Sequence, residues 1–179
     1  MSNFYKVAII GGGAGGLMTA SYLCDGKTVS PSDIIVFEKN DRVGKKLSAT
    51  GNGQGNITNK NISPENYRGE SLFVAAAVDN VKSADLTDYF YKNSLPVSFD
   101  EEGRGYPVSR QANAVTDVLR AKLSYFGVTV KTETTALKID KRGKNFTVTT
   151  DAGEYNAEYV VCAFGGKAGR VFGTDGSGY

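Results

Sequence analysis

The most informative absence in this sequence is histidine, which occurs nowhere among its 179 residues. Histidine is the commonest general base in enzymes and a member of Ser/His/Asp triads, so this chain has no histidine base and cannot form such a triad. No other catalytic acid or base is identifiable from the sequence. We therefore expect that any chemistry comes from a bound cofactor or from groups outside the chain.

Cysteine is also scarce, with only Cys24 and Cys162 present. They lie far apart and form no CxxC motif, which argues against a disulfide framework, a zinc site of the usual spacing and a redox-active dithiol. This usage is typical of a reducing cytoplasm, and no metal site is predicted. Cys162 lies in an apolar run, where we expect a buried and inert thiol.

An excess of charge of either sign is missing as well, because 21 basic residues nearly balance 19 acidic ones. This balance predicts neither nucleic acid nor an anionic membrane as a partner. The uncharged run 7–24 is interrupted by five glycines and is marginal for the roughly 20 residues that span a bilayer. We therefore predict a soluble, cytoplasmic protein without a signal peptide or membrane span.

The N-terminal segment has the pattern of a βαβ unit. An apolar run at 5–10 (YKVAII) is typical of a buried parallel strand, and three consecutive glycines end it. A helix is predicted from Ala14 to about Leu23, with Asp25-Gly26 as its end signal, and a second strand at 33–38 (DIIVFE). The predicted fold class is therefore α/β, a Rossmann-like domain with a parallel sheet.

The remaining chain alternates in character. Segment 40–66 is rich in Gly, Asn, Lys and Thr and is predicted to be a long ordered loop, which inside a domain is usually functional. Two helices are predicted over 71–94, with Asp85 as a cap for the second, followed by a turn-rich stretch at 100–110. A third helix is predicted over 112–126, ended by Gly127.

Short strand-like runs follow at 128–132, 135–140, 145–150 and 154–157, and they predict a small antiparallel β layer attached to the main sheet. The run 159–164 (YVVCAF) again resembles a buried strand. The predicted division of this one domain is a βαβ unit at 1–39, a cofactor loop at 40–66, a helical region at 67–127, the antiparallel layer at 128–158 and a return strand with its loop at 159–179.

The βαβ unit carries a GxGxxG fingerprint in the context that gives this motif meaning, with a strand before it, a helix after it and an acid at the end of the next strand. Gly11 permits the sharp turn, Gly13 lets the backbone approach a pyrophosphate and Gly16 lets the helix pack closely. The free N–H groups and the dipole of the helix N-terminus favour the anion.

Glu38 is expected to accept hydrogen bonds from the hydroxyls of an adenosine ribose, and its charge disfavours a 2′-phosphate. The fingerprint therefore predicts FAD or NAD rather than NADP. It does not choose between the two, because both contain adenosine diphosphate. The alternative interpretation is that no cofactor binds: the glycines then form only a structural turn, and Glu38 is a solvated residue at the end of a strand.

The loop at 44–59 (GKKLSATGNGQGNITN) resembles the post-fingerprint loop of the aminoacetone-oxidase-like group of bacterial NAD(P)/FAD-dependent oxidoreductases. In that group the loop reads approximately G-[RK]-K-L-x-x-[ST]-G-[GN]-G-R-C-N-[IL]-T-N. Gln54 and Gly55 stand where the group usually has Arg and Cys, which removes a charged donor fork from the loop. Three further segments resemble the same group: 104–109 (RGYPVS), 160–166 (VVCAFGG) and 173–179 (GTDGSGY).

This resemblance implies FAD as the cofactor, bound by a two-dinucleotide-type domain that a substrate-side domain interrupts. It also implies that the chain is the N-terminal part of a protein about twice as long. The predicted cofactor-binding residues are Gly11, Gly13, Ala14, Gly15, Gly16, Glu38, Lys39, Lys46, Thr50, Gly51, Asn52, Gly53, Asn56, Gly165 and Gly166.

Two other groups of residues are open to more than one interpretation. Arg104 and Tyr106 either orient a substrate near the flavin or stabilise a turn and pack in the core. The acidic run at 100–102 favours a solvated turn over a catalytic carboxylate pair.

The sequence thus predicts an FAD-dependent oxidoreductase whose flavin accepts a hydride or electron pair from an organic substrate or a reduced nicotinamide, with NAD(P)H as a possible partner. Two alternatives remain open: an NAD-binding dehydrogenase and a catalytically incomplete nucleotide-binding fragment. A flavoprotein acting on RNA bases is disfavoured by the balanced charge. The substrate and the oligomeric state are not predicted.

Overall fold

The computed structural model of the protein describes residues 3–26, 28–68, 71–167, 171 and 176. The predicted loop at 173–179 lies outside these residues except for Gly176. The chain forms two compact units, and we describe each by itself. Unit 1 comprises Met1–Leu47 and Leu119–Tyr179, and unit 2 comprises Ser48–Val118.

Unit 1 contains the predicted βαβ unit. Strand β1 (Phe4–Ile10) leads into helix α1 (Ala14–Asp25), a short 3-10 turn η1 (Pro31–Asp33) follows, and strand β2 (Ile34–Phe37) pairs with β1 in parallel. All four residues of β2 are buried, as is the second half of β1. Gly26 follows α1 and donates its N–H to the carbonyl of Tyr22, so the predicted end of the helix is confirmed.

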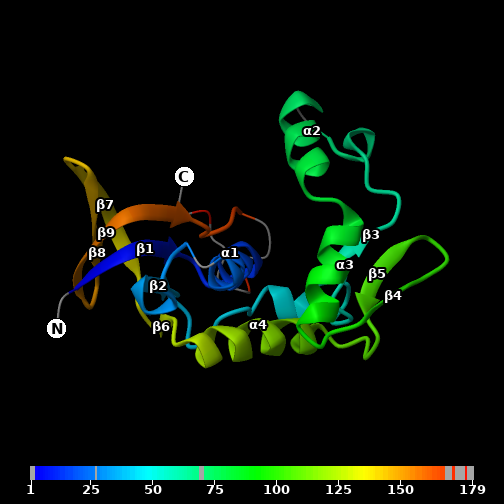
Figure 1. The fold of residues 1–179 in the computed structure, drawn as a ribbon, viewed down its shortest axis with the longest axis horizontal. Helices are drawn as coiled ribbons and strands as arrows, with labels where there is room; N and C mark the ends of the chain where they lie inside the picture. Colours follow the sequence, from blue (N-terminus) through cyan, green and yellow to red (C-terminus); the bar gives the residue numbers. More distant parts are fainter. Residues whose placement is uncertain (1–2, 27, 69–70, 168–170, 172–175, 177–179) are drawn as a thin grey trace. The chain divides into compact units, whose positions relative to one another are not determined.

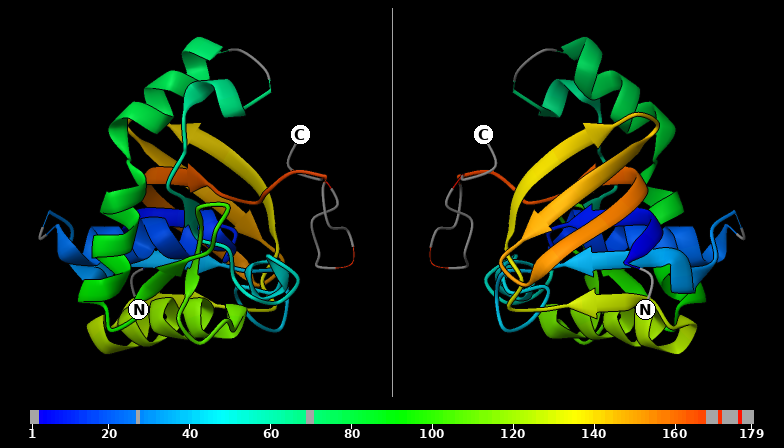
Figure 2. Two further views of the ribbon diagram at one scale, coloured as in Figure 1. Left: turned by 90° about the vertical axis from the view of Figure 1, so that its right-hand side faces the viewer. Right: turned by 90° about the vertical axis from the view of Figure 1, so that its left-hand side faces the viewer.

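The sheet of unit 1 has six strands in the order β6-β2-β1-β9-β8-β7. The additional strands are β6 (Thr129–Lys131), β7 (Ala136–Arg142), β8 (Asn145–Thr150) and β9 (Gly153–Cys162). Strands β6, β2, β1 and β9 run parallel, whereas β8 and β7 continue the sheet in antiparallel fashion. Figure 1 shows the orange β9 beside the blue β1, and Figure 2 gives two further views of the same sheet. The α/β fold class with a parallel sheet is confirmed.

Two details differ from the strands that the sequence predicts. The run at 154–157 and most of the run at 159–164 form one strand, β9, whose first part (153–157) pairs with β8 and whose later part (156–162) pairs with β1. The run at 128–132 belongs to the parallel part, because β6 pairs with β2. The half-buried Glu158 interrupts the apolar pattern of β9, so one strand looked like two in the sequence.

A shared core joins the parallel and antiparallel parts of this sheet. Phe37 at the end of β2 and Tyr155 on β9 pack edge to face, with 4.9 Å between their ring centroids. Such aromatic pairs add to the stability that burial of their area provides. The same core cluster contains Ala8, Ile10, Ile35, Val148 and Ala157.

Unit 2 contains most of the helical region and a small antiparallel sheet. Helices α2 (Ser71–Asn80) and α3 (Ser83–Lys92) are followed by strands β4 (Val97–Phe99) and β5 (Arg104–Pro107), and β5 also pairs with the short β3 (Thr58–Asn59). Asp85 takes part in capping α3, but as its third residue rather than as the N-cap: the N-cap is Lys82, and the carboxylate of Asp85 accepts its backbone N–H at 2.7 Å. Two 3-10 turns, η2 (Leu47–Ala49) and η3 (Pro64–Asn66), lie in the predicted loop.

Helix α4 (Ala112–Phe126) begins in unit 2 and ends in unit 1. Its apolar residues recur at helical spacing, and Val115, Leu119 and Leu123 are buried. After Gly127 the N–H of Val128 donates to the carbonyl of Leu123, which is the hydrogen bond of a glycine-ended helix.

Candidate functional site

The turn between β1 and α1, residues 11–16, is called the fingerprint turn below. The N–H of Gly11 donates to the carbonyl of Phe37, and the N–H of Gly44 donates to the carbonyl of Gly12, both at 2.8 Å. Gly13 is the N-cap of α1, and no side chain caps this helix. The first N–H groups of α1 have no partner within the helix, so the turn presents donors and the positive end of a helix dipole.

Two glycines of the fingerprint turn are required by the protein itself. A Cβ on Gly16 would lie 1.9 Å from the carbonyl oxygen of Gly11, so the predicted close packing of the helix is confirmed. A Cβ on Gly11 would lie 2.4 Å from the carbonyl oxygen of Ala163, and the φ angle of Gly11 is +108°. Backbone atoms cannot move aside cheaply, so both positions exclude a side chain for internal reasons.

Gly13 and Gly15 differ from these two positions. A Cβ on Gly13 would meet no heavy atom within 4 Å, and a Cβ on Gly15 would make only an ordinary contact with Ala163 at 3.9 Å. Gly13 has a φ of −80°, which any residue adopts. Nothing in the described part of unit 1 therefore requires glycine at position 13, where the backbone is open to a close approach.

Glu38 follows β2 and its carboxylate lies against the fingerprint turn. Oε2 accepts the N–H of Gly12 at 2.9 Å, while Oε1 accepts the backbone N–H and the side-chain amide of Asn40 at 2.9 and 2.6 Å. An ionised carboxylate has about four acceptor positions. The hydrogen bonds among the described residues use two on Oε1 and one on Oε2, so Oε2 keeps an acceptor position for a hydroxyl.

Several other predicted cofactor residues also lie in unit 1. Gly165 and Gly166 follow the end of β9, whose next residue, Ala163, donates its N–H to the carbonyl of Ile10. This places the return strand beside the fingerprint turn, as the predicted site requires. Lys39 is exposed and Lys46 is half-buried.

The loop at 50–56 in unit 2, called the glycine loop below, is a tight backbone turn. The carbonyl of Thr50 accepts the N–H groups of Gly53 and Gly55, both at 3.0 Å, and the carbonyl of Gly53 accepts the N–H of Ala112 at 2.8 Å. A Cβ on Gly55 would lie 2.8 Å from the Cα of Ala112. The loop is therefore fixed against the start of α4.

Asn56 has a structural task in this loop. Its amide nitrogen donates to the carbonyls of Thr58 and Gly105, at 3.1 and 3.2 Å. These bonds connect the glycine loop to β5. A cofactor contact by Asn56 stays a prediction. Because both hydrogen bonds use the amide nitrogen, the side chain would make such a contact through its amide oxygen.

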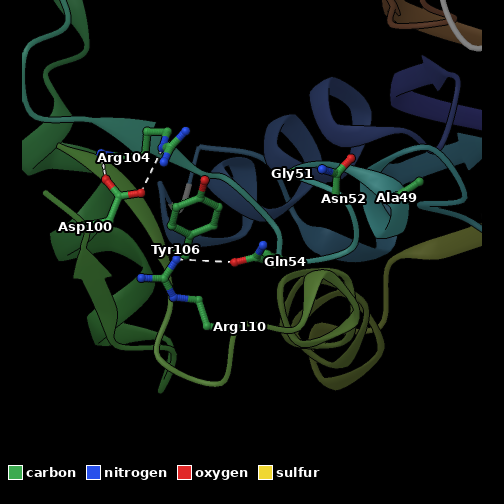
Figure 3. A pocket seen from close by; sticks show the side chains of 8 residues that line it. All are labelled: Ala49, Gly51, Asn52, Gln54, Asp100, Arg104, Tyr106 and Arg110. Atoms are coloured by element: carbon green, nitrogen blue, oxygen red, sulfur yellow. Dashed lines mark hydrogen bonds and ion pairs between the residues drawn. The ribbon is translucent and has the colours of Figure 1, made fainter. Parts of the chain in front are cut away.

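The glycine loop borders a pocket of about 410 Å³ in unit 2. The pocket is lined by side chains and backbone of Ala49, Gly51, Asn52, Gln54, Asp100, Arg104, Tyr106 and Arg110, shown in Figure 3. Most of these groups are polar or charged. The predicted residues Gly51 and Asn52 thus face the same hollow as Arg104 and Tyr106.

Arg104 acts as a turn-stabilising residue, one of the two roles the sequence left open. Its Nε donates to Asp100 at 2.8 Å and its Nη1 lies 2.7 Å from Glu102. Burial alone would raise the pKa of Asp100, but hydrogen bonds and charge from Arg104 outweigh it, so the pKa is lowered. The hydrogen bond to Asp100 in turn raises the pKa of Arg104. The acidic run 100–102 is confirmed as a structural turn.

Arg110 is the pocket residue that the sequence did not indicate. Its guanidinium lies over the ring of Tyr106, 4.3 Å from the centroid, and its Nη1 donates to Gln54 at 3.4 Å. The hydrogen bond between Arg110 and Gln54 joins two segments that are distant in the sequence, so no local pattern could reveal it. A guanidinium is thus present beside Gln54, the position where the resemblance expects an arginine.

The two cysteines are both free thiols. Cys24 on α1 is buried, and burial raises its pKa. Cys162 is exposed, so the predicted burial of this thiol is wrong. It is the last residue of β9, and an apolar run does not reveal which face of a strand at a sheet's end is covered. Among the described residues no cluster of His, Cys, Asp and Glu could hold a metal ion.

A strand-turn-helix with a glycine fingerprint and an acid after the second strand defines a dinucleotide-binding domain of the Rossmann-like class. The chain belongs to a family within this class, the HI0933-like protein Rossmann domain family, whose model matches residues 5–179. The broader part of the resemblance is therefore confirmed. The narrower likeness to the aminoacetone-oxidase-like group stays a prediction.

Two curated relatives extend over nearly the whole chain. A 3-dehydro-bile acid delta(4,6)-reductase of Clostridium scindens is 33% identical and the match covers 97% of this chain but 42% of the relative. A ribosomal RNA dihydrouridine synthase of Haemophilus influenzae is 22% identical, with 100% and 45% covered. The chain therefore spans less than half the length of these relatives.

Solved structures share the fold at low sequence identity. THI4 of Thermovibrio ammonificans superposes with a TM-score of 0.59 at 18% identity, covering 91% of this chain and 58% of that one. L-amino acid deaminase of Proteus vulgaris gives a TM-score of 0.54 at 18% identity, covering 96% and 50%. These likenesses concern the fold alone. In the described part of the chain, no helix is both long and apolar enough to cross a membrane.

Proposed function

We propose that the fingerprint turn binds the adenosine diphosphate half of FAD and that the protein is an FAD-dependent oxidoreductase. The observation that carries this proposal is the open space at Gly13, where no described atom would lie within 4 Å of a Cβ. Gly13 is also the N-cap of α1, so the backbone N–H groups of the helix N-terminus are next to this space. A pyrophosphate needs such an open backbone. Membership of the HI0933-like family and the reductase named among the relatives support the same class.

The residues of unit 1 fit this group. The N–H groups at the start of α1, from Ala14 to Gly16, would hold the pyrophosphate, and the helix dipole favours its charge. Glu38 would accept a ribose hydroxyl at Oε2 while Gly12 and Asn40 hold the carboxylate in place. The same negative charge would repel a 2′-phosphate, which favours FAD or NAD over NADP.

The glycine loop is proposed to contribute to the flavin end. Thr50 to Gly53 would offer hydroxyl, amide and backbone donors, and the hydrogen bonds of Asn56 hold the loop rigid for that task. Bound FAD would supply the capacity to accept a hydride or electron pair from an organic substrate or a reduced nicotinamide. The protein's own residues position and polarise these groups, and its location in the cytoplasm remains a prediction.

The test is a calorimetric titration of the purified protein with FAD and, separately, with NAD and with ADP, with visible absorption and flavin fluorescence as a second readout for FAD. We expect saturable FAD binding and a clearly weaker response to NAD. Glu38→Arg should weaken FAD binding at least tenfold, because it removes the ribose acceptor and places a cation against the turn. Tighter binding of NAD than of FAD would favour the dehydrogenase alternative. A protein that binds ADP as tightly as FAD would be the catalytically incomplete nucleotide-binding fragment, and a protein that binds none of the three would contradict the proposal.

A second candidate function is the reduction of a nucleobase in RNA. Its support is the name of the Haemophilus relative, a ribosomal RNA dihydrouridine synthase. The net charge of +2 argues against it, since RNA binding depends strongly on basic surface. Salt-dependent binding of a ribosomal RNA fragment would favour this candidate over a small-molecule substrate.

A further inference from the structure

We propose that the pocket of unit 2 is a binding site for a carboxylate group, with Arg110 as the residue that binds it. The pocket is lined by two arginines, but their surroundings differ. Arg104 is paired with Asp100 and Glu102. Arg110 has no acidic partner among the residues that the structure describes. The pocket therefore has one guanidinium whose charge is not neutralised.

The side chain of Arg110 is oriented for such a task. Tyr106 is only 7% exposed, and its ring lies against the guanidinium at 4.3 Å from the centroid. Stacking on an aromatic face fixes the plane of the guanidinium and leaves its edge for hydrogen bonds. Gln54 accepts one N–H through its Oε1 at 3.4 Å, as Figure 3 shows. A guanidinium has five N–H donors, so enough remain for a bidentate bond to a carboxylate.

Arg110 also precedes a helix along the chain. It lies two residues before Ala112, where the 15-residue helix α4 begins. The start of α4 is held against the glycine loop, because the N–H of Ala112 donates to the carbonyl of Gly53. The positive end of the α4 dipole therefore adds to the guanidinium charge in favouring an anion in this part of unit 2.

A carboxylate fits better than a phosphate here because the single unpaired guanidinium balances one negative charge, whereas a doubly charged phosphate would also face the carboxylate of Asp100 in the same pocket. Gln54 and Asn52 supply amides that would bind further polar atoms of the same ligand. The role of this pocket as a substrate site rests on the proposed function, since Gly51 and Asn52 belong to the loop proposed for the flavin end. The carboxylate affinity itself does not require FAD.

The test uses benzoate and inorganic phosphate as probes on the full chain, by calorimetric titration at fixed ionic strength, with and without added FAD. We expect millimolar benzoate binding and weaker phosphate binding. R110Q should reduce the benzoate affinity at least tenfold, and R110K should lie between R110Q and the unchanged protein because lysine keeps the charge but not the fork. The matched control is R142Q, an exposed arginine at the end of β7 in unit 1, which should have no effect.

Equal benzoate affinity in R110Q and the unchanged protein, with circular dichroism showing both folded, would overturn the proposal. So would an equal loss in R142Q, which would indicate a general charge effect, or tighter binding of phosphate than of benzoate. Failure of the proposed function is a separate result, because it would appear as absent FAD binding while benzoate still binds in an Arg110-dependent manner.

Discussion

The fingerprint turn and the glycine loop are both glycine-rich, yet their glycines are explained by different causes. In the glycine loop, Gly53 has open space around its Cβ position but a φ of +83°, so the backbone alone accounts for the glycine. In the fingerprint turn, Gly13 has the same open space and an ordinary φ. Gly13 is therefore a glycine that neither the packing nor the backbone conformation of the described residues requires, whereas Gly53 is required by its backbone conformation.

This difference teaches how to separate structural from functional glycines. Where a Cβ would strike backbone atoms, as at Gly16, glycine is needed for folding. Where the space is open and φ is ordinary, as at Gly13, neither packing nor backbone conformation requires glycine, and beyond the modest preference for glycine at an N-cap a ligand is the remaining reason for it. The stability of matched alanine variants can therefore break or sharpen the comparison.

The largest effect is expected for Gly16→Ala. The new Cβ would have to displace the carbonyl oxygen of Gly11 from 1.9 Å, which requires the helix and the turn to separate. We expect a loss of about 3 kcal/mol in the free energy of unfolding, or failure to fold. Urea denaturation followed by circular dichroism measures it.

The matched control is Gly15→Ala, the preceding residue on the same helix. Its Cβ would meet only Ala163 at 3.9 Å, and alanine favours a helix over glycine by about 1 kcal/mol. We expect equal or slightly higher stability. Similar losses in both variants would contradict the packing explanation.

A smaller loss is expected for Gly55→Ala in the glycine loop. Its Cβ would lie 2.8 Å from the Cα of Ala112, and its φ is +76°. Together these should cost about 2 kcal/mol. Gly53→Ala, with the φ penalty alone, should lose about 1 kcal/mol. Thermal and urea unfolding of the two variants would contradict this account if Gly53→Ala were the less stable.

The smallest effect concerns acid sensitivity of the pocket turn. The folded-state pKa of Asp100 lies below its ordinary value, so its contribution to stability is present above the unfolded pKa and is lost as the pH falls through the folded pKa. Between about pH 5 and about pH 3, the unchanged protein should lose more stability than Asp100→Asn. Urea midpoints at both pH values test this, and parallel losses would contradict it.

Local patterns in the sequence were sufficient for much of unit 1 and for the helices. The βαβ unit, the ends of α1 and α4 at glycines and the cap at Asp85 depend on neighbouring residues, so they could be predicted. The hairpin β4–β5 could not, because β4 has only three residues and the four residues of β5 include Gly and Pro, so neither strand carries much periodic signal. The Arg110–Gln54 contact joins segments that only the fold brings together.

The candidate site divides in the same way. The fingerprint and Glu38 could be predicted because one motif fixes their spacing, and the structure places the Glu38 carboxylate 2.9 Å from the N–H of Gly12. The burial of Cys162 was mispredicted because hydrophobic runs do not show which strand face is covered. The engagement of Asn56 with two backbone carbonyls depends on β5, which the sequence did not indicate.

The most direct test of the central claim is FAD binding by Gly13→Ala, measured beside its unfolding free energy. We predict a loss of no more than about 1 kcal/mol in the free energy of unfolding, which is the usual cost of alanine at an N-cap, because no described atom lies within 4 Å of the new Cβ. We also predict an FAD affinity at least tenfold lower. Tenfold corresponds to about 1.4 kcal/mol of binding free energy. FAD bound as tightly by Gly13→Ala as by the unchanged protein would contradict the assignment of the fingerprint turn as the cofactor's diphosphate site.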